Sequence, residues 1–374
     1  MNSKLKEVAQ VFFKLGCFAF GGPAAHIAMM EDEIIEKRKW MTRDYFLDLI
    51  GATNLIPGPN STEMTMHCGY ERAGKAGLFV AGIAFIIPAT LITALLAYLY
   101  VKYGELPEVE PFIYGIKPAV LAIIASAILK LGKKAIKSTE LIIIGVLVLA
   151  VSILGVNEVV ALLSAGVLGM LYFYLKSKTI SNLNSISPFF LLLGLNTTIA
   201  KISTLKLFLI FLKVGAILYG SGYVLFAYLD AELVTRGLLT RAELIDAIAI
   251  GQFTPGPVLS TSTFIGYQLS GFTGALVATT GIFLPSFLFV LILSPFIPRM
   301  RKSILLRYFL DSVNVAAVAV MLAVLVVMAK ETLIEWQSIL IAVLAVFITF
   351  KTKISTIWTI IIGAVLGYVL LTLF

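Results

Sequence analysis

The tripeptide Pro-Gly-Pro occurs twice, at Pro57-Gly58-Pro59 and at Pro255-Gly256-Pro257, and small polar residues follow each copy. Proline lacks a backbone N–H and restricts the residue before it, so each copy predicts the end of one helix and the start of another. A helix N-terminus carries partial positive charge and free N–H groups, which attract anions. One copy alone fits an ordinary tight turn, whereas the repetition favours an anion site near the middle of a membrane.

The polar residues after each tripeptide are candidates for capping the new helices and for contacting the anion. Together with nearby polar residues they form the first part of a predicted substrate-binding set: Asn54, Pro57, Gly58, Pro59, Asn60, Ser61, Thr62, Gln252, Pro255, Gly256, Pro257, Ser260 and Thr261.

Two lysines, Lys14 and Lys213, complete this set with the glycine clusters that follow them. Each lies about ten residues into an apolar segment, which at 1.5 Å per residue is about 15 Å deep, near the bilayer centre. A lysine at that depth is costly unless paired or hydrated, so both are candidate anion ligands, with snorkelling as the alternative. The clusters either pack helices closely or unwind them around a substrate. Their residues are Gly21, Gly22, Gly220 and Ser221.

Three carboxylates are candidates for coupling to protons. Asp48 and Asp246 occupy equivalent positions before the two tripeptides, where they either pair with Arg43 and Arg241 or take up protons. Glu63 follows the first tripeptide and has no acidic counterpart near Thr261. That asymmetry suits a proton carrier or a gate in one half only. Charge at a membrane interface is the alternative for the aspartates.

Other chemistry is not indicated. His26 and His67 have no metal-ligand spacing around them, and Cys17 and Cys68 lie in apolar surroundings typical of small buried side chains. We find no Walker motif, nucleophile elbow or zinc-protease helix. We therefore expect no metal, no cofactor and no enzymatic activity, and nothing supports a nucleotide-driven pump.

The composition is that of a multi-pass membrane protein. Of 374 residues, 59% are hydrophobic and 13% are charged, and the mean hydropathy is +0.99. Soluble globular domains are far less apolar. The net charge of +8 could suggest nucleic acid, but the basic residues lie in short loops at apolar boundaries, where they report membrane topology. The expected surroundings are therefore a lipid bilayer, in the cytoplasmic (inner) membrane, with no nucleic acid partner.

The apolar pattern predicts an all-α polytopic fold made of two homologous repeats. Each repeat has about five spanning helices and one helix–break–helix hairpin. The expected spans are 8–30, 77–101, 112–131, 140–155 and 157–175, then 204–229, 274–297, 304–329, 337–350 and 355–373, with hairpins at 43–72 and 240–270. The repeats should occupy 1–178 and 204–374, joined by a linker at 179–203.

Equivalent special residues recur in register between the halves, which indicates duplication. Lys14, Gly16 and Phe20 match Lys213, Gly215 and Tyr219, and further on Gly69, Gly74 and Pro88 match Gly266, Gly271 and Pro285. An odd number of crossings in each half inverts the second repeat. Most basic residues then fall on one face, which should be cytoplasmic, and both termini should lie outside. A re-entrant segment at Gly21-Gly22 would move the N-terminus inside.

The motifs resemble those of the chromate ion transporter family. The first half carries Phe20-Gly21-Gly22-Pro23, Pro57-Gly58-Pro59-Asn60-Ser61-Thr62-Glu63 and Gly69-Tyr70-Glu71-Arg72-Ala73-Gly74, and the second carries Gly251-Gln252-Phe253-Thr254-Pro255-Gly256-Pro257. The two copies cover almost the whole chain, as in the long two-domain members. The resemblance implies export of chromate driven by the proton gradient, and a relation to sulfate, which has the same tetrahedral dianionic shape. Gly222 in place of Pro23 and Val258 in place of Asn60 indicate unequal sites.

The leading hypothesis is a secondary active oxyanion transporter that binds its anion between the two helix starts and rocks one half against the other. An anion channel is the second hypothesis, because the same helix ends could line a pore. An intramembrane enzyme acting on a phosphorylated lipid is the third, and it lacks an acid–base or metal cluster. Glycine-rich faces permit a homodimer without requiring one.

Overall fold

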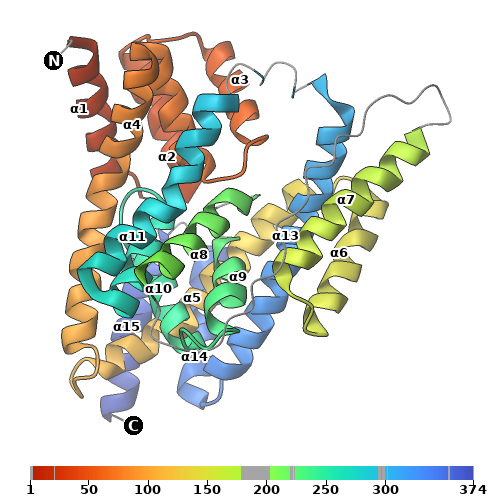
Figure 1. Cartoon of the computed structure of the whole chain (residues 1–374). Helices are drawn as coiled ribbons and strands as arrows, with labels where there is room; N and C mark the ends of the chain where they lie inside the picture. Colours follow the sequence, from red (N-terminus) through yellow and green to blue (C-terminus); the bar gives the residue numbers. More distant parts are fainter. Residues whose placement is uncertain are drawn as a thin grey trace.

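The computed structural model describes residues 3–20, 22–177, 203–219, 222, 224–293, 296, 300, 302–352 and 354–373. Every regular element in these ranges is helical, and the bundle is shown in Figure 1. The first repeat contains α1 (Ser3–Phe18), α2 (Gly22–Glu31), η1 (Asp32–Lys37), α3 (Arg43–Thr53), α4 (Asn60–Tyr103), α5 (Glu110–Ala135), α6 (Thr139–Ile153) and α7 (Glu158–Ser177). The second contains α8 (Thr204–Ile217), α9 (Leu225–Leu229), η2 (Asp230–Val234), α10 (Arg241–Phe253), η3 (Val258–Ser260), α11 (Thr261–Leu293), α13 (Ile304–Thr332), α14 (Trp336–Lys351) and α15 (Thr356–Leu373).

Among the described residues, six segments are long and apolar enough to cross a bilayer: α4, α5, α7, η3 with α11, α13 and α15. Helix α5, with 26 residues, is about 39 Å long at 1.5 Å per residue, more than the ~30 Å hydrocarbon core. Helices α6 and α14 are apolar but shorter. The chain is therefore an all-α polytopic membrane protein, as its composition predicts.

The two repeats are intertwined rather than side by side. Helix α5 of the first repeat packs against α14 and α15 of the second, and α13 of the second packs against α6 and α7 of the first. Helices α4 and α11 pack against each other and run in opposite directions, so the second repeat is inverted relative to the first (Figure 1). Small residues allow this closeness: a Cβ on Gly115 of α5 would lie 2.1 Å from the carbonyl oxygen of Gly363 of α15.

Both long central helices are broken at equivalent positions. Gly74 interrupts α4 with a φ of +63°, and Gly271 interrupts α11 with a φ of +61°. Only glycine adopts such angles readily. These breaks separate the predicted hairpins, which end at residues 72 and 270, from the spans that follow them.

The expected continuous spans 8–30 and 204–229 are wrong. Helix α1 ends at Phe18 and α2 begins at Gly22, which has a φ of +78°, while α8 ends at Ile217 and α9 begins at Leu225. In the first repeat the interruption falls at Gly22, because glycine accepts a positive φ and Pro23 suits the first turn of the next helix.

This interruption also corrects the predicted position of the N-terminus. Glu7 of α1 pairs with Arg72 at 2.7 Å and with Arg38 at 3.7 Å, so the chain starts on the face that carries the basic loops. Figure 1 shows the two termini at opposite ends of the molecule. The physical reason is that α1 and α2 form a hairpin that returns to the face it entered, instead of one crossing.

The limits of the repeats stay predictions. Residues 179–202 of the expected linker lie outside the described residues, as do the candidate ligands Gly21, Gly220 and Ser221. Ser203 caps α8 by accepting a hydrogen bond from the amide of Lys206.

Candidate functional site

Each Pro-Gly-Pro loop is bound to the helix break of the other repeat. The amide of Gly58 donates to the carbonyl of Leu218, just after α8, at 2.6 Å, and the amide of Gly256 donates to the carbonyl of Ala19, just after α1, at 2.9 Å. The four broken segments therefore meet where the two repeats cross.

Glycine is required at both loops. Gly58 has a φ of +139° and Gly256 a φ of +82°. A Cβ on Gly58 would lie 2.2 Å from Oε1 of Glu63 and 2.6 Å from Oγ of Ser286, and one on Gly256 would lie 2.9 Å from Cβ of Ala89. Backbone angle and space both exclude a side chain at these positions.

The polar residues after the loops do not cap the helices as expected. Pro59 and Pro257 are the N-cap residues, and neither position has a side-chain cap. The hydroxyl of Thr261 instead donates to the carbonyl of Val258, and Ser260 lies 3.4 Å from the hydroxyl of Thr254. Short hydroxyl side chains commonly bond nearby carbonyls in this way.

In the first repeat the same region contains a histidine. Nδ1 of His26 on α2 lies 3.2 Å from the hydroxyl of Ser61, and its Nε2 lies 3.1 Å from the carbonyl of Ala19. Asn60 donates to the side-chain oxygen of Asn54 at 2.6 Å. His26 thus links α2 to two other parts of the first repeat, the break after α1 and the start of α4. The sequence reasoning treated it as a lone histidine.

Glu63 is the most isolated carboxylate of the site. Its side chain is wholly buried, and neither of its oxygens has a hydrogen-bond partner among the described residues. The hydroxyls of Thr62 and Ser286 and Nε2 of His67 are also buried without a described partner. Buried polar atoms are normally satisfied, so this cluster points to water, an ion or a proton that binds there.

Lys14 and Lys213 are each paired with a glutamate 19 residues later in the chain. Nζ of Lys14 lies 3.0 Å from Oε1 of Glu33, and Nζ of Lys213 lies 2.6 Å from Oε1 of Glu232. The glutamates are buried, whereas the lysines are 60% and 43% exposed. These ion pairs partly neutralise the positive charges of Lys14 and Lys213, which were expected to bind the anion.

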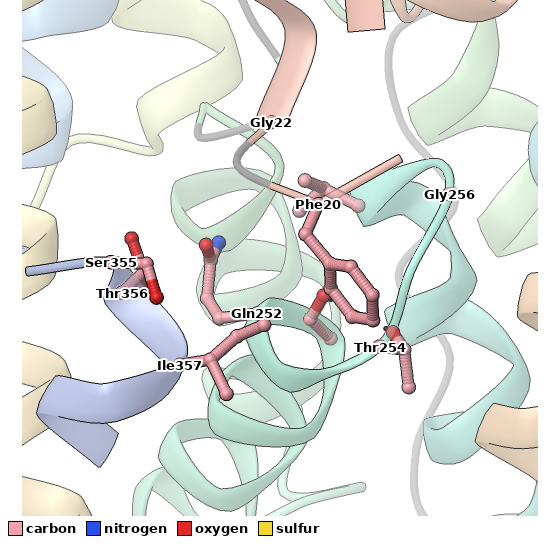
Figure 2. A pocket seen from close by; sticks show the side chains of 10 residues that line it. Phe20, Gly22, Gln252, Thr254, Gly256, Ser355, Thr356 and Ile357 are labelled. Carbon is pink, nitrogen blue, oxygen red and sulfur yellow. Dashed lines mark hydrogen bonds between the residues drawn. The ribbon is translucent and has the colours of Figure 1, made fainter. Parts of the chain in front are cut away.

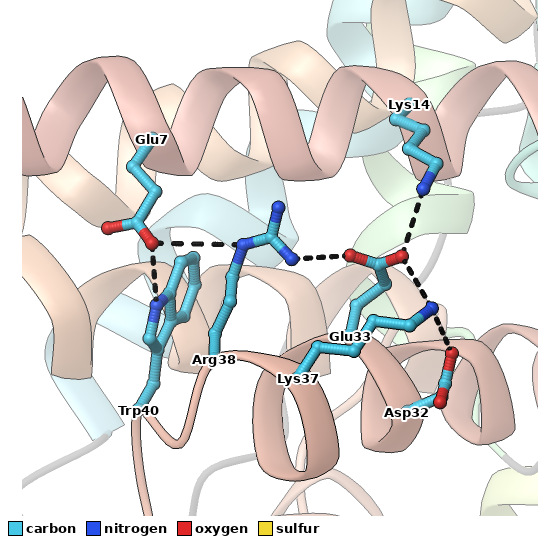
Figure 3. A network of polar contacts seen from close by, with 7 residues as sticks. All are labelled: Glu7, Lys14, Asp32, Glu33, Lys37, Arg38 and Trp40. Carbon is cyan, nitrogen blue, oxygen red and sulfur yellow. Dashed lines mark hydrogen bonds and ion pairs between the residues drawn. The ribbon is translucent and has the colours of Figure 1, made fainter.

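Figure 3 shows the network around Lys14. Glu33 accepts from Lys14, from Lys37 and from Arg38, the last at 2.6 Å. In the second repeat Arg236 binds Glu232 at 2.8 Å, as Lys37 binds Glu33 in the first. Sequence reasoning missed both glutamates. The signal was available, because the shift of 199 that aligns the lysines also aligns Glu33 with Glu232.

The arginines pair with acids other than those expected. Arg43 pairs with Glu31 at 2.6 Å, and the equivalent Arg241 pairs with Asp230 at 2.9 Å. The predicted pair of Arg241 with Asp246 is therefore wrong. The reason is that α2–η1 and α9–η2 fold back and present their own acids to these arginines.

Asp246 instead connects the two repeats. It is buried in α10, accepts a hydrogen bond from the hydroxyl of Tyr100 at 2.6 Å, and lies 3.5 Å from Nζ of Lys117. Tyr100 and Lys117 belong to the first repeat. The equivalent Asp48 is exposed on α3, so the two aspartates differ in surroundings despite their equivalent positions.

A small cavity of about 70 Å³ lies beside the second Pro-Gly-Pro loop (Figure 2). Phe20 lies on one side of it and the start of α15 on the other, with Gln252 between them. The cavity brings together parts of both repeats. Its lining residues, none of them charged, are Phe20, Gly22, Gly251, Gln252, Thr254, Gly256, Val258, Ser355, Thr356 and Ile357.

A larger cavity of about 490 Å³ lies beside the first loop and includes Asn54 and Asn60. These correspond to Gln252 and Val258 of the small cavity at a shift of 198, so each cavity is lined on its loop side by equivalent segments of the two repeats. The remaining lining differs, because it includes the start of α15 in the small cavity and parts of α5 and α13 in the larger one. In the described part of the chain no three His, Cys, Asp or Glu side chains are grouped as metal ligands.

Comparisons with known proteins agree on one family. The sequence profile of the family described as chromate transporter matches residues 6–170 and again 205–368. A chromate transport protein of Cupriavidus metallidurans is 30% identical over 93% of this chain and 88% of that protein. A probable chromate transport protein of Synechococcus elongatus is 31% identical over 98% of this chain and 95% of that protein. An uncharacterized transporter of Methanocaldococcus jannaschii is 27% identical over 99% of this chain and 95% of that protein. No solved structure matches the chain.

Proposed function

Because the chain belongs to the chromate transporter family, we propose that it is a secondary transporter that exports chromate, or a related oxyanion such as sulfate, using the proton gradient. Two full-length relatives are named for chromate transport, which supports this anion as the substrate. The proposed location is the cytoplasmic membrane, where a proton gradient is available.

The observation that carries the proposal is the crossed bonding of the two Pro-Gly-Pro loops. Gly58 donates to Leu218 of the other repeat, and Gly256 donates to Ala19 of the other repeat. Any motion of one repeat against the other must change both contacts. Substrate sites of transporters built from inverted repeats lie at such a repeat interface, on broken helices. The anion would bind between the starts of α4 and η3–α11, with hydroxyl groups such as that of Thr62 as ligands.

Lys14 and Lys213 would supply positive charge to the anion. Since each is held by a buried glutamate, the anion would compete with Glu33 or Glu232 for the lysine during transport. Replacing either lysine with methionine should abolish anion binding. Unchanged chromate affinity in both variants would remove the lysines from the site.

Glu63 is the strongest candidate for the coupling proton, with Asp246 and Asp48 as further candidates. Glu63 is buried in an apolar interior and its carboxylate has no hydrogen-bond partner among the described residues, and an ionised carboxylate is costly in such surroundings, which makes it suited to carry the coupling proton. Glu63 also lies against Gly58, so gain or loss of its proton would change the charge beside the first loop.

The test is chromate flux in proteoliposomes with and without an imposed pH gradient, with sulfate as competitor. Accumulation that follows the gradient and falls with sulfate would support a coupled oxyanion transporter. Passive equilibration would instead indicate an anion channel. Absence of chromate flux in active, correctly inserted protein would exclude chromate as the substrate.

A further inference from the structure

The larger cavity has a strongly basic wall, and we call it the basic cavity. It is enclosed by the end of α3 and start of α4 in one region, and by the end of α5 and start of α13 in another. It therefore lies between the repeats and reaches the first Pro-Gly-Pro loop. Its lining includes Asn54, Asn60, Lys134, Lys137, Arg307 and Asp311.

The charges on this wall do not balance. Lys137 is paired with Asp311 at 2.6 Å, which removes one positive charge. Lys134 and Arg307 are exposed, and neither side chain has an ion pair or hydrogen bond to another residue in the part of the chain that the structure describes. Two uncompensated cations, one from each repeat, remain on the wall. A concave basic surface concentrates anions by electrostatic attraction.

The related small cavity beside Gly256 has no charged lining residue. Asn60 at the basic cavity, for example, corresponds to the apolar Val258 at the small one. The two cavities thus differ in charge although the repeats are homologous. An anion would be attracted to the basic cavity and held less strongly at the small cavity.

We propose that the basic cavity is the capture site for a tetrahedral divalent oxyanion, with Lys134 and Arg307 as its charged ligands. The side-chain amides of Asn54 and Asn60, hydrogen-bonded to each other, line the region of the same cavity that adjoins Pro59. The inference rests on the proposed function for the identity of the anion. The phosphate of an anionic lipid has similar chemistry, and adding such a lipid to the binding assay separates the two.

The variant that tests the capture site is Lys134→Gln with Arg307→Gln. Its matched control is Lys130→Gln with Lys133→Gln, which removes two exposed charges from α5 that do not line the cavity. Chromate and sulfate binding are measured by calorimetry on the full chain in phosphatidylcholine nanodiscs. Chromate flux into vesicles is measured separately. Loss of two charged ligands should weaken binding, and raise the half-saturating chromate concentration, about tenfold or more.

The binding and flux results distinguish this inference from the proposed function. A tenfold weakening in the cavity variant, with the control within twofold of the unmodified chain, supports capture by Lys134 and Arg307. Equal behaviour of the two variants overturns the capture site, while chromate flux in the unmodified chain still upholds the proposed function. If anion binding depends on Lys134 and Arg307 but the unmodified chain shows no chromate flux, the oxyanion site is supported and chromate export is refuted. If the unmodified chain shows neither chromate binding nor chromate flux, both the capture site and the proposed function are refuted.

Lipid occupancy is tested by adding phosphatidylglycerol to the nanodiscs. If the cations hold a lipid phosphate, this lipid should raise the melting temperature of the unmodified chain and of the control, but not of the cavity variant. That result, together with chromate binding equal in all three proteins, would overturn oxyanion capture. A melting temperature that is independent of phosphatidylglycerol supports the free anion as the ligand.

Discussion

Replacing Lys213 with methionine should destabilise the protein clearly more than replacing its equivalent, Lys14. The carboxylate of Glu232 is 1% exposed and has two cations, Lys213 at 2.6 Å and Arg236 at 2.8 Å. Without Lys213 it keeps a single partner. Removing one partner of a buried ion pair costs about 3–5 kcal/mol. Because Lys213 is 43% exposed and Arg236 remains, we expect a smaller loss of unfolding free energy, about 1.5–3 kcal/mol, which is typical of a hydrogen bond to a charged group.

The matched comparison is Lys14→Met. Glu33 is buried like Glu232 but keeps both Lys37 at 3.1 Å and Arg38 at 2.6 Å after this change. Lys14 is also 60% exposed, which screens its contribution. The expected loss is therefore about 1 kcal/mol or less, typical of an exposed pair.

Both variants are measured as shifts in the midpoint of denaturant unfolding in one detergent, with far-ultraviolet circular dichroism as the signal. A third variant, Lys213→Met with Glu232→Gln, removes both charges and should recover part of the loss, since no buried charge is left unbalanced. Equal losses for Lys14→Met and Lys213→Met, or no recovery in the double variant, would refute this reasoning.

Three further changes test other contacts. Gly58→Ala should lower the free energy of unfolding by about 2–4 kcal/mol, because the new Cβ would clash with the carboxylate of Glu63 and the hydroxyl of Ser286. Gly132→Ala should be tolerated, because the nearest atom lies 3.6 Å from the new Cβ. Equal unfolding midpoints of the two variants would contradict the clash. Glu63→Gln should leave chromate binding within about threefold but abolish the response of flux to a pH gradient, and a retained response would exclude Glu63 as the proton carrier. Tyr100→Phe should lower stability by about 1.5–3 kcal/mol, since Asp246 loses its 2.6 Å hydrogen bond, and an unchanged unfolding midpoint would mean that this bond contributes nothing.

Much of the fold follows from local features of the sequence. Apolar runs long enough to cross the hydrocarbon core predict the spans α5, α7, α13 and α15 to within a few residues, because continuous apolar helices are the stable way for a chain to cross a bilayer. The Pro-Gly-Pro copies predict both helix breaks. The breaks after α1 and α8 were harder to predict, because apolar glycine-rich segments can continue as kinked helices or end.

The candidate site, like the fold, was only partly predictable from the sequence. Sequence alone predicted Lys14, Lys213 and Glu63 as candidate site residues and indicated the equivalence of the two repeats, since unusual residue types in apolar segments need no structure to be noticed. It could not identify the partner of each charge. That depends on which segments fold back, and the hairpin that presents Glu33 to Lys14 is a tertiary feature.

The sequence by itself thus determined that the chain is a duplicated, helical membrane protein with two Pro-Gly-Pro breaks, because span length, proline chemistry and repeat register are local properties. Only the tertiary structure decided that each loop binds the other repeat, through Gly58 with Leu218 and Gly256 with Ala19. It also decided that Lys134 and Arg307, 173 positions apart, share one cavity. Contacts between residues so distant in the sequence depend on how α5 and α13 pack between the repeats, and no pattern within either helix specifies that packing.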